Sequence, residues 1–287
     1  MRRVSLALLV GALVCLCFAG CGGTETGGSG ERKVITVKGS DTMVILGQRW
    51  AEEYMNKNPG ISIQVTGGGS GTGIAALING ATDICESSRP MKEKEKQDIR
   101  ARHGKEVKEI PVALDGLAIY VHHSNPIQSI TRAQLKSIYR GRLSNWRELG
   151  WENAQIVTYS RENNSGTYVF FKEHILDNED FAENVQTLPG TAAIVNAVAN
   201  DRRSIGYGGI AYSSGIRAVP VVGKEGGEAV SPSLETVQSG KYPLSRNLYF
   251  YTAGEPLGHI KEFINWVLSD EGQKTCDQVG YYPLKKQ

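Results

Sequence analysis

Short β-rich runs alternate with helical stretches along most of this chain of 287 residues. A strand expected at 34–38 is followed by a helix at 42–58, and a strand at 62–66 is followed by a helix at 72–79. This alternation is typical of an α/β protein, in which helices cover the faces of a mostly parallel sheet. The pattern therefore predicts the α/β class.

The alternation continues toward the carboxyl end. Further helices are expected at 91–103, 131–139, 167–176, 192–200 and 260–269, and further strands at 109–121, 155–160, 205–210, 218–222 and 248–252. No internal repeat of fixed period is present. A chain of this length is sufficient for about two domains with buried cores.

Three turns rich in Gly and Ser stand after an expected strand and before an expected helix. They are Gly39-Ser40-Asp41-Thr42, the run 67–73, and the run 161–167. The first amide groups of a helix have no partner inside it, and the helix dipole favours negative charge there. Ser, Thr and Asp are also ordinary helix N-caps, so one such turn is weak evidence. Three in one chain, one of them with the fork-shaped donor Arg161, predict a buried site for a small oxyanion.

The same turns lack the patterns that enzymes need. The run 67–73 has no Gly-Lys-Ser/Thr ending, which a phosphate-binding P-loop requires. Ser70 lacks the closing glycine of a nucleophile elbow, and no nearby base is evident. The sequence therefore favours a binding protein that is not an enzyme and has no cofactor.

The charge balance argues against nucleic-acid binding. There are 32 Lys and Arg against 30 Asp and Glu, and Arg2 with Arg3 account for the whole excess of +2. Proteins that bind DNA or RNA carry a clustered basic surplus that displaces counterions from phosphates. We expect no nucleic-acid partner.

Residues 1–20 have the form of a signal peptide. Arg2 and Arg3 precede an apolar run of about fifteen residues, which is shorter than the ~20 needed to span a bilayer. Phe18-Ala19-Gly20-Cys21 resembles a bacterial lipobox, in which Cys21 becomes an acylated N-terminus, with palmitate among the possible chains. Phe18 departs from the usual Leu, and an ordinary secretory signal is the alternative. Residues 21–33 are then a flexible tether.

Two cysteines remain outside the N-terminal region. Cys85 and Cys276 could form one disulfide in an oxidising compartment or stay as two buried thiols, and the sequence leaves both possibilities open. His122-His123 does not have a usual ligand spacing, and no metal is assigned.

Over essentially its whole mature length the sequence resembles the PstS family, the periplasmic phosphate-binding proteins of the phosphate-specific ABC transporter. The motifs that carry the resemblance are Gly39–Thr42, Gly69–Gly73, Asp83–Pro90, Ala113–Gly116, Gly141–Trp146 and Arg161–Thr167. The resemblance implies a two-lobed periplasmic-binding-protein fold of type II, with the ligand in the cleft between lobes. It implies one lobe at 34–114 plus 248–287 and the other at 115–247, with a hinge near Leu114 and Arg246.

The resemblance also implies the binding residues. The residues expected at the phosphate are Ser40, Asp41, Thr42, Ser70, Ser88, Arg161, Ser165, Gly166 and Thr167. Ser88 is a departure, because the family has an Asp there that accepts a hydrogen bond from a protonated phosphate oxygen. A carboxylate would repel sulfate, whereas a hydroxyl both donates and accepts. Asp41 and Asp115 are possible substitute acceptors; the alternatives are helix capping for Asp41 and a strand-end turn for Asp115.

The function implied is capture of inorganic phosphate outside the inner membrane and its delivery to an ABC permease. We expect a lipid-anchored monomer on the periplasmic or cell-surface side of the membrane. Trp146 is expected to serve packing more than permease contact. The alternatives are a binding protein for another tetrahedral oxyanion such as sulfate, a phosphatase, and a surface adhesion or sensor protein.

Overall fold

The computed structural model describes residues 33–285. The expected signal peptide, Cys21 and all of the expected tether except Lys33 lie outside this range. The strands are β1 Lys33–Gly39, β2 Ile61–Thr66, β3 Ile84–Ser87, β4 Val107–Val121, β5 Ile130–Thr131, β6 Val157–Arg161, β7 Gln186–Leu188, β8 Ser204–Gly209, β9 Arg217–Val219, β10 Val221–Val222, β11 Ala229–Val230 and β12 Ser245–Ala253. The α-helices are α1 Val44–Lys57, α2 Ser70–Ile78, α3 Glu93–His103, α4 Arg132–Tyr139, α5 Gly166–His174, α6 Gly190–Asn200, α7 Leu234–Gln238, α8 Gly258–Leu268 and α9 Asp270–Val279.

Most of the strands form one mixed sheet. Within the described residues its order is β2-β1-β3-β12-β4-β8-β6-β7, and β9 also pairs with β4. The pairs β1–β2, β1–β3 and β6–β8 are parallel, as expected where helices connect successive strands. The first and third sequence-predicted turns therefore lie at the carboxyl ends of the parallel strands β1 and β6. This is where α/β sheets commonly bind ligands.

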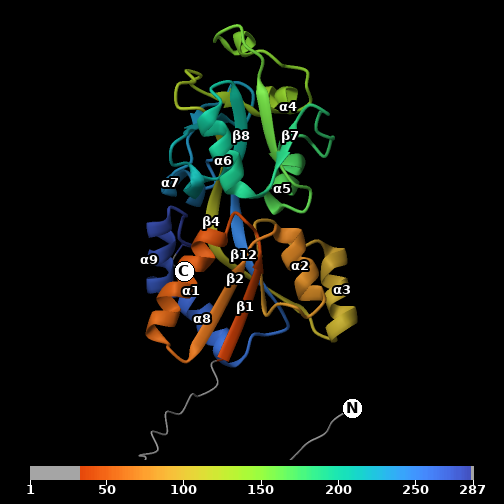
Figure 1. Ribbon diagram of the computed structural model, residues 1–287, viewed down its shortest axis with the longest axis vertical. Coiled ribbons are helices and arrows are strands. Elements are labelled where there is room, and N and C mark those ends of the chain that lie inside the picture. Colours follow the sequence, from red (N-terminus) through yellow and green to blue (C-terminus); the bar gives the residue numbers. More distant parts are fainter. Residues whose placement is uncertain (1–32, 286–287) are drawn as a thin grey trace, which may run out of the picture. The chain divides into compact units, whose positions relative to one another are not determined.

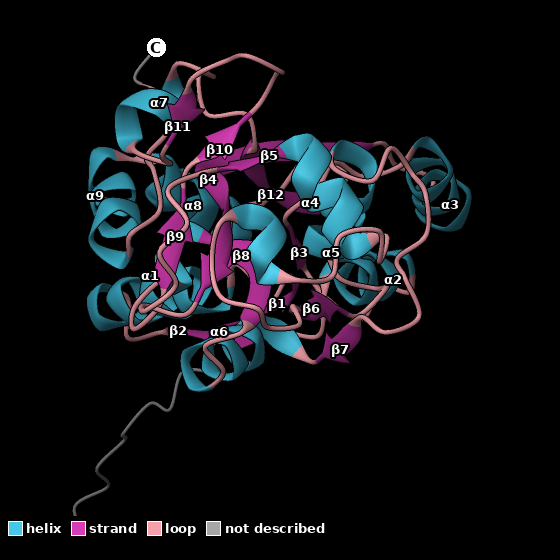
Figure 2. Ribbon diagram, turned by 90° about the horizontal axis from the view of Figure 1, so that it is seen from above, coloured by secondary structure: helices cyan, strands magenta, loops and turns pink. Residues whose placement is uncertain are grey.

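Two long antiparallel strands join the two ends of this sheet. β4 pairs with β12 over its first part and with β8 and β9 over its last part. Figure 1 shows β1, β2, α1, α2, α3, α8 and α9 around one end of β4 and β12, and α4, α5 and α6 around the other. Figure 2 shows the same strands from above, with helices on both sides.

The buried apolar side chains form separate clusters toward the two ends of β4 and β12. One cluster holds Ile35, Leu46 and Phe263 and lies between the sheet and helices α1 and α8. Another holds Ile74, Cys85 and Ile99 and lies on the opposite face, under α2 and α3. Beyond the middle of β4, a third cluster contains side chains from Leu117 to Leu244.

The α/β class and the placement of the three turns between strand and helix are confirmed, but some elements differ from the sequence prediction. β3 was not predicted, because its four buried residues include Glu86 and Ser87 and show no apolar alternation. α9 was also missed, since it begins with charged residues. The strand predicted at 218–222 is divided at Pro220, which has no N–H for the ladder; β9 pairs with β4, whereas β10 pairs with β5 and β11.

Two smaller questions from the sequence are answered. Cys85 and Cys276 are both buried free thiols, and burial raises the pKa of each. Trp146 is fully buried and its indole N–H donates to the carbonyl of Arg203, which confirms its packing role.

No helix within 33–285 combines the length and apolarity that crossing a bilayer requires.

Candidate functional site

Side-chain hydroxyls from four segments converge at the carboxyl ends of the central strands. We call Ser40, Thr42, Ser70, Ser88 and Thr167 the hydroxyl cluster. Each of these side chains is at most 1% exposed. Their hydroxyls are close enough to hydrogen-bond one another. The fold thus brings together residues that lie up to 127 positions apart in the chain, from Ser40 to Thr167.

Ser88 is at the centre of the hydroxyl cluster. Its Oγ accepts a hydrogen bond from Ser40 Oγ at 2.9 Å and lies 3.4 Å from Ser70 Oγ and 3.5 Å from Thr167 Oγ1. Its amide N–H donates to Ser70 Oγ at 3.1 Å. Thr42 Oγ1 and Thr167 Oγ1 lie 2.7 Å apart. The cluster presents hydroxyl groups that can turn to donate to an anion.

Ser165 and Gly166 form the start of α5. The Ser165 hydroxyl accepts from the amide of Tyr168 at 3.3 Å and so caps the helix. Gly166 lies so close to the facing segments that a Cβ built on it would be 2.3 Å from Ser70 Oγ and 2.7 Å from Ser88 Oγ. Only glycine permits this approach.

Arg161, at the end of β6, is 1% exposed and is the charged group that the sequence predicted at the site. Its Nη2 donates to Asp41 Oδ2 at 2.6 Å, and its Nη1 donates to Thr191 Oγ1 at 2.8 Å. Its Nε–H has no hydrogen-bond partner within residues 33–285. A buried guanidinium with an unused donor is suited to bind an anion oxygen.

Asp41 does not cap α1. The N-cap of that helix is Met43, and no side chain caps it. The Asp41 carboxylate instead accepts from the amide of Gly68 at 2.7 Å and from Arg161, so it joins the first turn to the second and to the third. Tyr212 donates to the Asp41 carbonyl at 2.8 Å, and burial raises the pKa of Tyr212 to about 12.

Asp115 is not in a strand-end turn. It lies inside β4, fully buried, opposite Arg246 in β12. Arg246 Nε and Nη2 donate to Asp115 Oδ2 at 2.9 and 2.7 Å, and the amide of Ile210 donates to Asp115 Oδ1 at 3.1 Å. With Asp41 and Asp115 both held by arginines, neither carboxylate is a free acceptor.

Arg246 is a candidate site residue that the sequence analysis placed only near a hinge. Besides Asp115, it contacts the hydroxyl cluster on two sides: Nη1 donates to the Ser88 carbonyl and Nη2 to Thr167 Oγ1, each at 3.1 Å. It also lies over the ring of Phe170, 5.3 Å from the centroid. No turn or motif marks this residue, since it lies in a strand. The only signal was an Arg and an Asp in two segments that both cross the expected hinge.

The second and third turns also contact each other, through their backbones and through the Asn164 side chain. The amide of Gly71 donates to the carbonyl of Asn164 at 2.8 Å, and Asn164 Nδ2 donates to the carbonyl of Gly68 at 3.0 Å. A Cβ on Gly69 would lie 2.8 Å from the Asn164 carbonyl. The glycines in the run 67–73 therefore allow the two backbones to touch.

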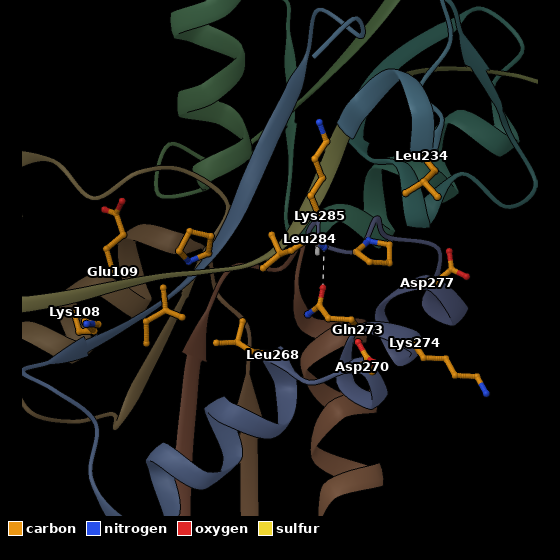
Figure 3. Close-up of a pocket in the computed structure, with 13 residues that line it drawn as sticks. Lys108, Glu109, Leu234, Leu268, Asp270, Gln273, Lys274, Asp277, Leu284 and Lys285 are labelled. Carbon is orange, nitrogen blue, oxygen red and sulfur yellow. Dashed lines mark hydrogen bonds between the residues drawn. The ribbon is translucent and has the colours of Figure 1, made fainter. Parts of the chain in front are cut away.

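A separate groove of about 940 Å³ lies between β4 and α9 (Figure 3). Its walls include Ile110, Pro111 and Leu284, and its rim carries Lys274 and Asp277. None of the sequence-predicted binding residues lines it. Its apolar floor and mixed charges do not suit a small oxyanion. Within residues 33–285, no group of three or more His, Cys, Asp or Glu side chains is arranged so that it could hold a metal ion.

Comparison with known proteins identifies the family. The model of the PBP superfamily domain matches residues 24–271. The phosphate-binding protein PstS of Pseudomonas aeruginosa is 36% identical over 273 residues, covering 89% of this chain and 84% of that protein. The chain belongs to the PstS family.

Other members of the PstS family are similar to this chain along nearly their full length. The phosphate-binding protein PstS of Bacillus subtilis is 32% identical over 297 residues, covering 99% of this chain and 94% of that protein. A solved structure from Clostridium perfringens, assigned to a phosphate ABC transporter and containing bound phosphate, has a TM-score of 0.80 at 32% identity, covering 88% of this chain and all of that one. The fold is the type II periplasmic-binding-protein fold that the sequence predicted.

Proposed function

We propose that this chain captures inorganic phosphate at the hydroxyl cluster and delivers it to an ABC permease. The observation that carries the proposal is the convergence of five buried hydroxyls and two arginines, Arg161 and Arg246, in a member of the PstS family. Buried neutral donors with a guanidinium replace the water around an oxyanion, and hydrogen bonds to a charged group contribute about 1.5–3 kcal/mol each. Ser40, Asp41, Thr42, Ser70, Ser88, Arg161, Ser165, Gly166 and Thr167 are proposed to form this site, with Arg246 added.

The ligand is proposed to lie between two lobes, residues 34–114 plus 248–287 and residues 115–247. The separate hydrophobic clusters on either side of the middle of β4 support this division. Ser88 and Ser70 belong to one proposed lobe, and Arg161 and Thr167 to the other. Closure brings the two sets of donors together around the anion, and opening returns it to water.

We propose no chemistry on the bound phosphate. A phosphatase that used a serine or threonine nucleophile would need an adjacent base. Within residues 33–285 the hydroxyl cluster is hydrogen-bonded to its own members, to backbone and to Arg246, and not to any imidazole. Selectivity between phosphate and sulfate is proposed to depend on Ser88, because both nearby carboxylates are held by arginines.

Delivery requires the chain to be outside the inner membrane. We propose that Cys21 carries the lipid anchor and that the protein acts as a monomer. The tether predicted at 21–33 is proposed to end at residue 32, because Lys33 is already the first residue of β1. The lipobox-like sequence Phe18–Cys21 supports the anchor. More than one acyl chain is needed for firm attachment, at about 0.8 kcal/mol per buried methylene.

The test is calorimetric titration of ligand-stripped protein with phosphate and with sulfate. We expect tight phosphate binding by the wild type and a loss of about 100-fold or more in Arg161→Ala, because removing the guanidinium leaves Asp41 and the anion facing each other. Arg161→Lys should recover only part of the affinity, since an ammonium cannot form a planar fork. Arg203→Ala, which removes an exposed arginine paired with Asp201, is the control.

Two results would contradict the proposal. Absence of measurable phosphate binding by the wild type would reject the function. Affinity of Arg161→Ala within threefold of wild type would reject the site while leaving the function in place. Urea unfolding without phosphate is measured for both proteins, because Arg161→Ala also removes the hydrogen bond to Thr191 within the same proposed lobe, and affinities are compared under conditions where both proteins are folded.

A further inference from the structure

A carboxyl group beside the first turn of α1 is buried and has no hydrogen-bond partner among the described residues. Glu86 is the third residue of β3, two positions before Ser88, and its side chain is 0% exposed. Neither of its carboxyl oxygens has a hydrogen-bond partner within residues 33–285. Unpaired buried carboxylates are rare because an isolated charge in the interior is very costly.

The side chain of Glu86 points toward the first turn of α1. On β3 it shares a face with Ile84, which packs in the same cluster as Leu46 of α1. A Cβ built on Gly47 would lie 2.2 Å from Glu86 Oε1, so the carboxyl occupies the space that any larger residue at position 47 would fill. The backbone is coupled as well, because the amide of Ser40 donates to the Glu86 carbonyl at 2.9 Å.

This position couples Glu86 to the proposed anion site. α1 begins two residues after Thr42, and its first turn is one of the sequence-predicted anion seats. The carboxyl is packed against the sheet-facing side of that turn. A negative charge there would oppose an anion held by the same turn, whereas a protonated carboxyl would not.

The charged groups on the surrounding elements do not neutralise Glu86. Lys38 is on the face of β1 opposite Ile35 and Val37, which pack toward α1. The other charged groups nearby have partners of their own: Arg49 with Glu52 and Glu53, Lys57 with Glu271, Asp41 with Arg161, and Arg246 with Asp115. Burial raises the pKa values of Cys85 and Tyr212, and the nearby Glu86 carboxyl raises each a little further. Burial raises the pKa of Glu86 itself well above the usual range.

We propose that Glu86 is a positioning residue whose proton is needed for tight anion capture. Protonated, it fills the space at Gly47 and leaves the first turn of α1 free to attract the ligand. Deprotonated, it places an unsolvated negative charge behind that turn and weakens binding. The anion's identity as phosphate rests on the proposed function.

The expected size follows from Coulomb's law. Two unit charges about 10 Å apart, at an effective dielectric constant of about 20, change a binding constant on the order of tenfold. Bound phosphate should in turn hold the Glu86 proton more firmly. Phosphate affinity should therefore fall as the pH rises through the pKa of Glu86, in addition to any effect of the ligand's own ionisation.

The experiment is phosphate titration of wild type and Glu86→Gln from pH 6 up to the highest pH at which both proteins remain folded. Taking the ratio of the two dissociation constants at each pH removes the ligand's own ionisation. We expect the dissociation constant of the wild type divided by that of the variant to be near one at pH 6. This ratio should rise to about ten at the alkaline end of the range. Glu52→Gln, which removes an exposed carboxylate of α1, is the matched control and should give a flat ratio.

A second variant separates charge from hydrogen bonding. Glu86→Met has a similar length and no charge, and the same rise in the ratio is expected. A ratio that stays constant with pH for both variants would overturn the proposal and leave Glu86 as a packing residue. Absence of phosphate binding by the wild type at pH 6 would overturn the proposed function and this inference together, whereas a flat ratio with intact binding would reject only the inference.

Discussion

Gly166 offers a direct test of how closely the two sides of the proposed cleft approach. It is the first residue of α5, and its own backbone conformation would accept an alanine. The added methyl group, however, would lie 2.3 Å from Ser70 Oγ and 2.7 Å from Ser88 Oγ, where ordinary contacts begin at about 3.4 Å. Gly166→Ala therefore obstructs the approach of α5 to the opposite segments without removing any hydrogen-bonding group.

The expected effect is on binding and not on folding. Overpacking a close contact costs about 1–3 kcal/mol, which corresponds to about a 5- to 150-fold loss of phosphate affinity. Because the clash joins opposite proposed lobes, it is absent in an open form. There, alanine in place of glycine in a helix contributes up to about 1 kcal/mol of stability. Urea unfolding without phosphate should be unchanged or shifted slightly toward higher stability.

The assay compares calorimetric phosphate affinity and urea unfolding for wild type, Gly166→Ala and Gly60→Ala. A Cβ added to Gly60 would have no heavy atom of residues 33–285 within 4 Å, so an alanine there should leave affinity within threefold of wild type. The reasoning is refuted if Gly166→Ala also binds phosphate within threefold of wild type. That result would mean that α5 does not approach Ser70 and Ser88 this closely in the bound form.

Three further predictions concern the site and the chain's N-terminus. Ser88→Asp should increase the ratio of phosphate to sulfate affinity, because a carboxylate requires a ligand proton; an unchanged ratio in calorimetry would place Ser88 away from the anion. Cys21→Ser should move the protein from the membrane pellet to the soluble fraction with phosphate binding intact; equal retention in the pellet would reject the lipid anchor. The free energy of unfolding of Glu86→Gln should rise relative to that of the wild type as the pH increases above about 4.3. The difference should grow by up to about 1.4 kcal/mol per pH unit until Glu86 ionises in the folded state. The sign follows because the raised pKa of the folded state makes the wild type most stable below the unfolded pKa; a constant difference in urea unfolding between pH 4 and 7 would contradict it.

Local sequence signals were enough to locate three of the four segments that contribute to the hydroxyl cluster. The turns at 39–42, 67–73 and 161–167 were recognised because strand, turn and helix signals lie within a few residues of one another. β3 lacked such a signal, although it carries Ser88 into the centre of the hydroxyl cluster. Its assignment to the site came from the family resemblance and not from its own pattern.

The roles of the charged residues could not be predicted in the same way. Helix capping was a reasonable interpretation of Asp41, and a strand-end turn of Asp115, because each is the local role that aspartate most often has. The structure instead pairs Asp41 with Arg161 and Asp115 with Arg246, across 120 and 131 positions of the chain. Such pairs depend on sheet register and on the approach of distant segments.

The α/β class, the three turns between strand and helix and the family could all be read from the amino-acid sequence, because backbone preferences and short motifs are local properties. The folded chain was needed to learn which carboxylates are already neutralised, that Arg246 contacts the hydroxyl cluster, and that Glu86 is buried with no hydrogen-bond partner in the described part of the chain. The physical reason is that the free energy of a charge depends on its distance to other charges and to water. Those distances are set when β4 and β12 bring remote parts of the chain together.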